Sequence, residues 1–149
     1  MFELRRHRTL VKIAAIRATE RHVAQQELSV ANKRESEAIA AHRRAEAATI
    51  AAAAEWQDQI VTGGFHPELA SALAVELNRR VDDTHQASVD SAAMAEARDE
   101  SEVAWQRSTA WSRNAEESVV ASLRAIARDR DERALEALGD RVSFDWTRQ

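Results

Sequence analysis

The sequence predicts an all-α protein, a long two-stranded antiparallel coiled-coil hairpin, and three observations support this. Of the 149 residues, 31% are charged and 5% are aromatic, a composition typical of long helices. Glycine and proline total four residues, and three of these lie in the segment VTGGFHP at 61–67. Neither residue occurs at 2–59 or at 68–138, so two helix-compatible stretches flank a single break.

The first stretch predicts a helix over about residues 2–59. At a rise of 1.5 Å per residue it is roughly 85 Å long, which is typical of a coiled coil. Apolar residues recur in it every seven residues (Ile16, Val23, Val30) and also every eleven (Leu28, Ile39, Ile50), so we expect the register of the seam to drift. Residues 38–54 are mostly alanine, which predicts close helices that bury little apolar area there.

The break at 60–67 predicts a reversal of the chain. Gly63 and Gly64 can adopt positive φ where the first helix ends, and Pro67 suits the first turn of the next. A connection this short makes the two helices antiparallel neighbours. Residue numbers that face each other then sum to roughly 128, which places Arg17 near Trp111.

The second stretch predicts a helix over about residues 68–138, which overhangs the first by about twenty residues. Gly139 is expected to end this helix. In the tail at 139–149, Val142, Phe144 and Trp146 alternate with polar residues, an extended pattern. The tail aromatics either fold back on the hairpin or form a docking segment.

No residue pattern predicts catalysis. The five histidines form no HExxH motif or helical pair, cysteine is absent, and neither a G-x-S-x-G elbow nor a phosphate loop occurs. The carboxylates are spread along rods that offer no concave pocket. We therefore expect no enzyme activity, no cofactor, no metal site and no small-molecule substrate. The N-terminus shows no signal peptide and no long apolar span is present, so we expect a cytoplasmic protein.

Charge is unevenly distributed. Six basic residues stand against Glu3 and Glu20 near the N-terminus: Arg5, Arg6, Arg8, Lys12, Arg17 and Arg21. Residues 82–102 hold seven acidic residues and only Arg98 as a base. These segments are either solvated faces or binding surfaces, the basic end suiting an acidic or polar ring. A membrane-surface helix at 1–21 is an alternative. Nucleic acid is not expected, because the net charge is −4 and no aromatic residues accompany the arginines.

Trp105 and Trp111 are six residues apart and so lie on different faces of the second helix. Tryptophan is a favoured interface anchor, and it also fills space beside small residues. Both roles remain open for these two side chains.

This organisation resembles the FliJ-like proteins of flagellar export and the YscO-type stalk proteins of type III secretion. The resemblance rests on the Arg-rich opening FELRRHRTLVKIAAIRATERHVAQQELSVA, the alanine-rich middle, the Gly-containing tip, and the longer second helix with scattered Trp and a charged tail. It covers nearly the whole chain and depends on pattern, because the family has no sharp motif.

The resemblance implies a stalk and adaptor at the inner-membrane export apparatus. Its open end would insert into the hexameric export ATPase through Arg5, Arg6, Arg8, Lys12, Arg17, Arg124, Arg128 and Arg130. The region after the tip would contact the export gate membrane protein through Phe65, Leu69, Leu73 and Leu77, although the aromatic that the family carries after the tip is missing. Export chaperones are further implied partners, with Trp105, Trp111, Phe144 and Trp146 as possible partner or cargo contacts.

Two other functions fit the same residues. One is a structural coiled-coil scaffold that self-associates through exposed stripes, and the other is a cargo-binding export chaperone.

Overall fold

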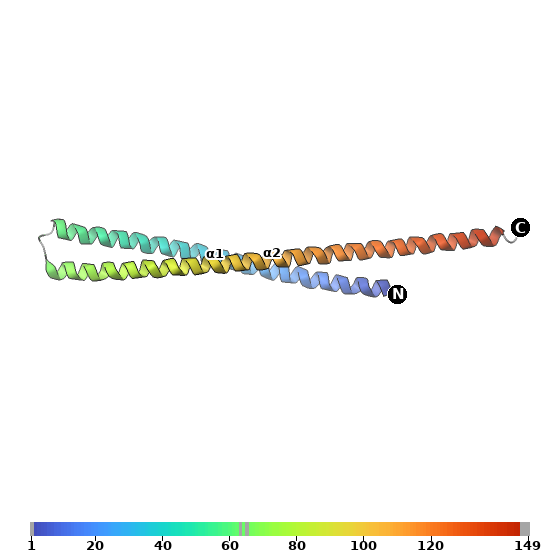
Figure 1. The fold of residues 1–149 in the computed structure, drawn as a ribbon, viewed down its shortest axis with the longest axis horizontal. Helices are drawn as coiled ribbons and strands as arrows, with labels where there is room; N and C mark the ends of the chain where they lie inside the picture. The colour runs from blue at the N-terminus through green and yellow to red at the C-terminus, as the bar shows by residue number, and fades with distance from the viewer. Residues whose placement is uncertain (1, 63, 65, 147–149) are drawn as a thin grey trace. The chain divides into compact units, whose positions relative to one another are not determined.

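Two long helices form the fold. The computed structural model describes residues 2–62, 64 and 66–146. Helix α1 spans Phe2–Thr62 and helix α2 spans Pro67–Trp146, with a short connection between them (Figure 1). The helices contact each other, which confirms the predicted all-α helical hairpin.

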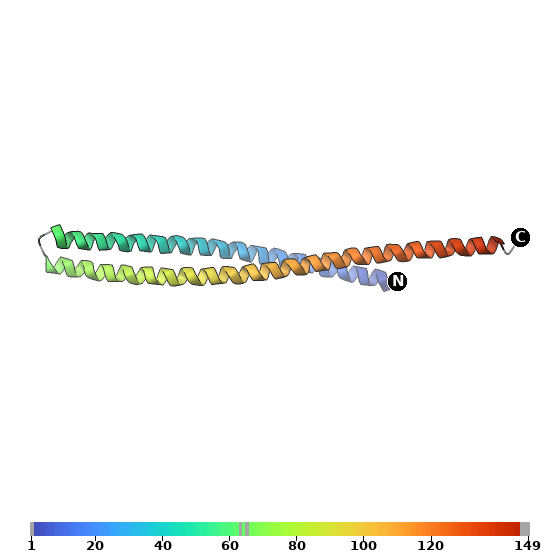
Figure 2. The same ribbon diagram turned by 45° about the horizontal axis from the view of Figure 1, so that its top comes forward.

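The chain divides into two compact units that both contain parts of α1 and α2. Unit 2 comprises residues 25–104, and in it the two helices run side by side from the connection (Figures 1 and 2). Unit 1 combines residues 1–24 with residues 105–149. In unit 1 every described side chain from Arg130 to Arg141 is exposed, so α2 continues beyond its partner helix as expected.

The connection between the helices is tighter than predicted. Helix α1 extends three residues past the expected end at 59, and the Thr62 hydroxyl donates to the Asp58 carbonyl at 2.6 Å. Gly64 has φ +53°, a conformation that favours glycine. The His66 carbonyl accepts the first helical hydrogen bond of α2 from the Ala70 amide at 2.9 Å. Pro67 is the first residue of that helix, where proline needs no amide donor.

Exchanging each described glycine for alanine is expected to change stability in opposite directions. Gly64→Ala places a Cβ in the left-handed region and should lower the free energy of unfolding by about 1–2 kcal/mol. Gly139→Ala lies inside α2 with open space around the new Cβ, and should raise helix stability by about 0.5–1 kcal/mol. Urea denaturation of both variants tests this, and the same sign for both would contradict it.

The expected extended tail after Gly139 is wrong, because α2 continues to Trp146. A single glycine costs a helix interior only about 1 kcal/mol, and the flanking residues include strong helix formers such as Leu138 and Arg141. The side chains of Phe144 and Trp146 lie outside those that the structure describes.

The contact between the helices, here called the seam, repeats every seven residues. In both helices the side chains shielded from solvent alternate in steps of three and four, as in a coiled coil. In α1 they include Leu10, Ala14, Arg17, Arg21, Ala24, Leu28, Ala31 and Glu35, and the same spacing continues to Gln59. The drift of register expected from the eleven-residue pattern is therefore absent from the described seam.

Small and polar residues make up much of this seam, which also holds leucines such as Leu28 and Leu73. Ile16, Val23 and Val30 recur every seven residues, yet they are 58%, 46% and 49% exposed. Among the described side chains, those more than nine-tenths buried are Ala24, Ser112 and Ser122. Small side chains let the backbones approach closely but bury little apolar area. The helices are consequently held together by shape and polar contacts more than by an apolar core.

Candidate interaction surfaces

Polar contacts join the helices within unit 2, and the first centres on Thr49. Its hydroxyl Oγ1 lies 2.9 Å from the Arg80 carbonyl oxygen and 2.7 Å from Oγ1 of Thr84. Thr84 Oγ1 is also 2.9 Å from the Arg80 carbonyl oxygen. Only the contacts of Thr49 cross the seam, because Thr84 and Arg80 belong to the same helix, and both half-buried hydroxyls find acceptors without solvent.

The second contact is an ion pair between Glu35 of α1 and Arg98 of α2. Arg98 Nε lies 3.2 Å from Glu35 Oε2, and its Nη1 lies 2.8 Å from Asp99 and 3.1 Å from Glu102. The hydrogen bond to Glu35 and the nearby carboxylates raise the pKa of Arg98. Three acidic groups thus surround one guanidinium, which leaves this part of unit 2 with an excess of negative charge.

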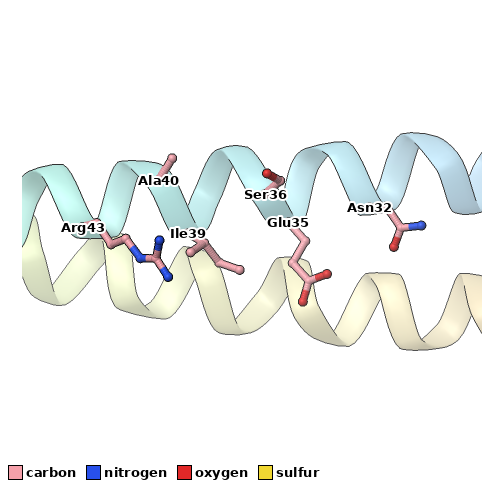
Figure 3. A pocket seen from close by; sticks show the side chains of 6 residues that line it. All are labelled: Asn32, Glu35, Ser36, Ile39, Ala40 and Arg43. Carbon is pink, nitrogen blue, oxygen red and sulfur yellow. The ribbon is translucent and has the colours of Figure 1, made fainter.

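A shallow hollow lies on α1 beside this ion pair (Figure 3). Asn32, Glu35, Ser36, Ile39, Ala40 and Arg43 line it, and all six come from successive turns of one helix. Glu35 and Arg43 point toward α2 in Figure 3, whereas Ser36 and Ala40 point away from it. The hollow has one helix as its wall, so it cannot enclose a small molecule as a typical ligand pocket does.

Near the connection, two arginines of α2 hold the carboxylate of Glu76. Arg79 donates from Nε and Nη2 at 2.9 and 2.8 Å, and Arg80 donates from Nε at 2.7 Å. These hydrogen bonds, those from Arg79 first, lower the pKa of Glu76 from 4.5 to about 2. All three side chains are on the surface, so the cluster stabilises the helix locally and is not a site of chemistry.

The Glu76 cluster predicts a defined pH dependence. Because its folded-state pKa is depressed, ionised Glu76 adds stability that is fully present above pH 4.5 and is lost as the pH falls toward 2. Glu76→Gln should therefore be less stable than the parent at pH 7, and this difference should vanish near pH 2. Urea denaturation across this range measures it, with Glu55→Gln as a control carboxylate outside the described ion pairs. A constant difference at every pH would contradict the assignment.

In unit 1 the expected pairing of Arg17 with Trp111 is confirmed. The Arg17 guanidinium carbon lies 4.8 Å from the Trp111 ring centroid, and Arg17 Nη1 contacts Glu20 at 2.7 Å. Arg21 reaches Glu116 of the other helix at 3.9 Å. Trp111 stays 46% exposed, while Trp105 lies half-buried in the seam. Arg17 and Trp111 are therefore engaged with each other and present only part of their surface to a partner.

The structure gathers the predicted basic residues in unit 1. Arg5, Arg6, Arg8, Lys12, Arg124, Arg128 and Arg130 are all exposed, and Arg17 alone of the predicted set lies at the seam. Among the described residues none of these seven has an ion-pair partner. Arg124 lines a surface hollow of α2 together with Arg113 and Val120. Unit 1 holds 14 basic and 10 acidic residues, whereas unit 2 holds 7 and 15.

The predicted stripe after the tip is divided between two environments. Leu69 is exposed, whereas Leu73 and Leu77 are half-buried at the seam and pack between the helices. Phe65 lies outside the described residues. Only Leu69 of the described set is thus fully available to a partner.

Polar atoms without partners were not expected from the sequence. Nδ1 of His7, Oγ1 of Thr109 and Oγ of Ser122 are buried with no hydrogen-bond partner, and all three lie in unit 1. Each such atom carries a desolvation cost that no bond offsets. Ala24, Ala31, Ala38, Ala45 and Ala52 recur every seven residues at the seam, a spacing that the sequence shows but that does not by itself tell which heptad-spaced stripe is buried.

Comparisons with known proteins add no family assignment. No protein family model, no curated protein and no solved structure matches the chain. Within the described parts of α1 and α2 no segment is long and apolar enough to cross a bilayer. The same residues contain no cluster of three or more His, Cys, Asp or Glu that could hold a metal ion.

Proposed function

We propose that this protein is a stalk and adaptor of a flagellar or type III protein export apparatus, which docks unit 1 into the hexameric export ATPase. The observation that carries the proposal is that unit 1 concentrates exposed basic residues, seven of which have no ion-pair partner among the described residues, beside an α2 segment that extends past its partner helix. A protein ring with an acidic or polar inner wall offers the complementary surface.

The geometry of the helices suits this role. A stalk must be slender and stiff, and it needs no pocket for a substrate. Helices that pair through many small side chains have closely spaced backbones, and the heptad seam keeps them paired over many turns. The exposed Leu69, near the connection, is available for a second partner such as the export gate, so one molecule could link two parts of an apparatus.

Reversing the charge of the N-terminal arginines tests the proposal. The triple variant Arg5→Glu, Arg6→Glu, Arg8→Glu should weaken binding to the cognate export ATPase by about tenfold or more, because like charges would face the ring. Pull-down, binding titration and ATPase turnover measure the effect.

The matched control changes the same net charge in unit 2. Arg34→Glu, Arg43→Glu, Arg44→Glu alters three exposed arginines of α1 and should leave ATPase binding close to that of the parent. If the parent protein neither binds the ATPase nor changes its turnover, the proposed function is wrong. If both triple variants lose binding equally, the docking surface is not the basic end.

A further inference from the structure

The two units carry opposite charge, and each has exposed aliphatic side chains beside its charges. Unit 1 has four more basic than acidic residues, and unit 2 has eight more acidic than basic residues. Most of the N-terminal bases and several of the unit 2 acids have no ion-pair partner among the described residues. These unused charges are the starting point for a second interaction, which shares Arg5, Arg8 and Lys12 with the proposed docking to an ATPase but has a different partner.

On unit 1 three of the exposed aliphatic side chains, Leu4, Val11 and Leu123, lie on one side of the helix pair. Leu4 and Val11 each directly follow a seam residue of α1, and Leu123 directly follows the seam residue Ser122 of α2. In antiparallel helices with equivalent seam positions, residues offset alike from the seam lie on the same side. Arg8 lies one turn from both Leu4 and Val11. We call Leu4, Arg8, Val11 and Leu123 the basic–apolar face; all four side chains are exposed.

On unit 2 the complementary pattern runs along the outer side of α2. Val75, Asp82, Val89, Glu96 and Val103 recur every seven residues, so they form one line on a helix that keeps a heptad seam. The three valines are 67%, 49% and 54% exposed, and neither acid of the line has a described cationic partner. We call these five residues the acidic–valine stripe.

We infer that a second copy of this chain docks on the first, with the basic–apolar face of one copy on the acidic–valine stripe of the other. Aliphatic side chains of the two surfaces would cover each other, and Arg8 with its neighbours Arg5 and Lys12 would lie against part of the row of acids formed by Asp82, Glu96 and the adjacent Glu100. Charge sets the choice of partner: two basic–apolar faces, or two acidic–valine stripes, would oppose like charges. These aliphatic residues lie outside the seam and are exposed, so they are available for the contact between copies.

Charge-swapped variants test the inference by sedimentation velocity over about 1–100 µM, a range that brackets weak association. One variant carries Arg5→Glu, Arg8→Glu and Lys12→Glu, and the other carries Asp82→Lys, Glu96→Lys and Glu100→Lys. The parent should associate with rising concentration, less so at high salt. Each variant alone should be at least tenfold weaker, and an equimolar mixture of the two should associate again, because each supplies the surface that the other lacks.

A matched control, Glu27→Lys, Glu46→Lys, Glu55→Lys, reverses three acids of α1 in unit 2 and should associate like the parent. Circular dichroism confirms that each variant keeps its helices. A parent that stays monomeric throughout overturns the inference, as does association that the charge swaps leave unchanged or that mixing does not restore. Parent protein that is monomeric but sediments with phosphatidylserine vesicles, and not with phosphatidylcholine vesicles, would assign the basic face to lipid instead. Binding to the export ATPase is measured separately, so failure of one proposal leaves the other standing.

Discussion

Ser112→Leu is expected to lower the free energy of unfolding by about 1–3 kcal/mol, the typical cost of overpacking a filled interior. Ser112 is fully buried (0% exposed) at the seam of unit 1, where the helices leave room only for a small side chain. A leucine forces the backbones apart or adopts a strained rotamer. Hydrogen exchange should show the loss of protection first in unit 1, around residues 105–119.

The control is Ser112→Ala, which removes only the hydrogen bond from Ser112 Oγ to Glu116 at 3.1 Å. The acceptor Glu116 stays exposed to water after the exchange, so the loss should be about 1 kcal/mol or less and the alanine variant should stay close to the parent. If leucine is tolerated as well as alanine, the close approach of the helices at Ser112 is not what holds unit 1 together.

Thr109→Val is expected to raise the free energy of unfolding by about 1–3 kcal/mol. Oγ1 of Thr109 is buried without a hydrogen-bond partner, so exchange for a methyl group of similar size removes a desolvation cost and no bond. Thermal and urea denaturation measure the change.

The same exchange in unit 2 should have the opposite sign. Thr84→Val removes the hydroxyl that contacts Thr49 Oγ1 at 2.7 Å and the Arg80 carbonyl oxygen at 2.9 Å, and should cost about 1 kcal/mol. A stabilised Thr84→Val variant, or a destabilised Thr109→Val variant, would show that the described hydrogen bonding of these hydroxyls is not the deciding factor.

The sequence was sufficient to predict the two helices and the reversal between them. Gly64 and Pro67 act through backbone geometry, which is local and readable from residue type. The contact of Arg17 with Trp111 also followed from counting residues outward from the reversal. Gly139 misled the prediction of the second helix end, because one glycine costs less than the surrounding helix formers contribute.

Large apolar residues alone did not identify the seam, because some of them lie at it and others face solvent. Ile16, Val23 and Val30 keep a heptad spacing but face solvent, while alanines at the same spacing face the partner helix. Which of two heptad-spaced stripes is buried depends on how both helices fit together, and a single helix does not contain that information. For the predicted basic surface, the structure shows that the arginines of unit 1 are exposed, and the partner that binds them is proposed.

The polar contacts of unit 2 also determine how its helices respond to force along their axes. Many positions of this seam are alanine or serine at heptad spacing, and there a shift of seven residues would bring similar small side chains opposite each other. The Glu35–Arg98 ion pair is different, because it has no equivalent seven residues away. Such a slide would place Glu35 opposite Ser91 in one direction and opposite Trp105 in the other, and neither side chain is a cation. Together with the hydroxyl contact of Thr49, this pair opposes the sliding of one helix along the other and so fixes their relative register when force acts along the axes.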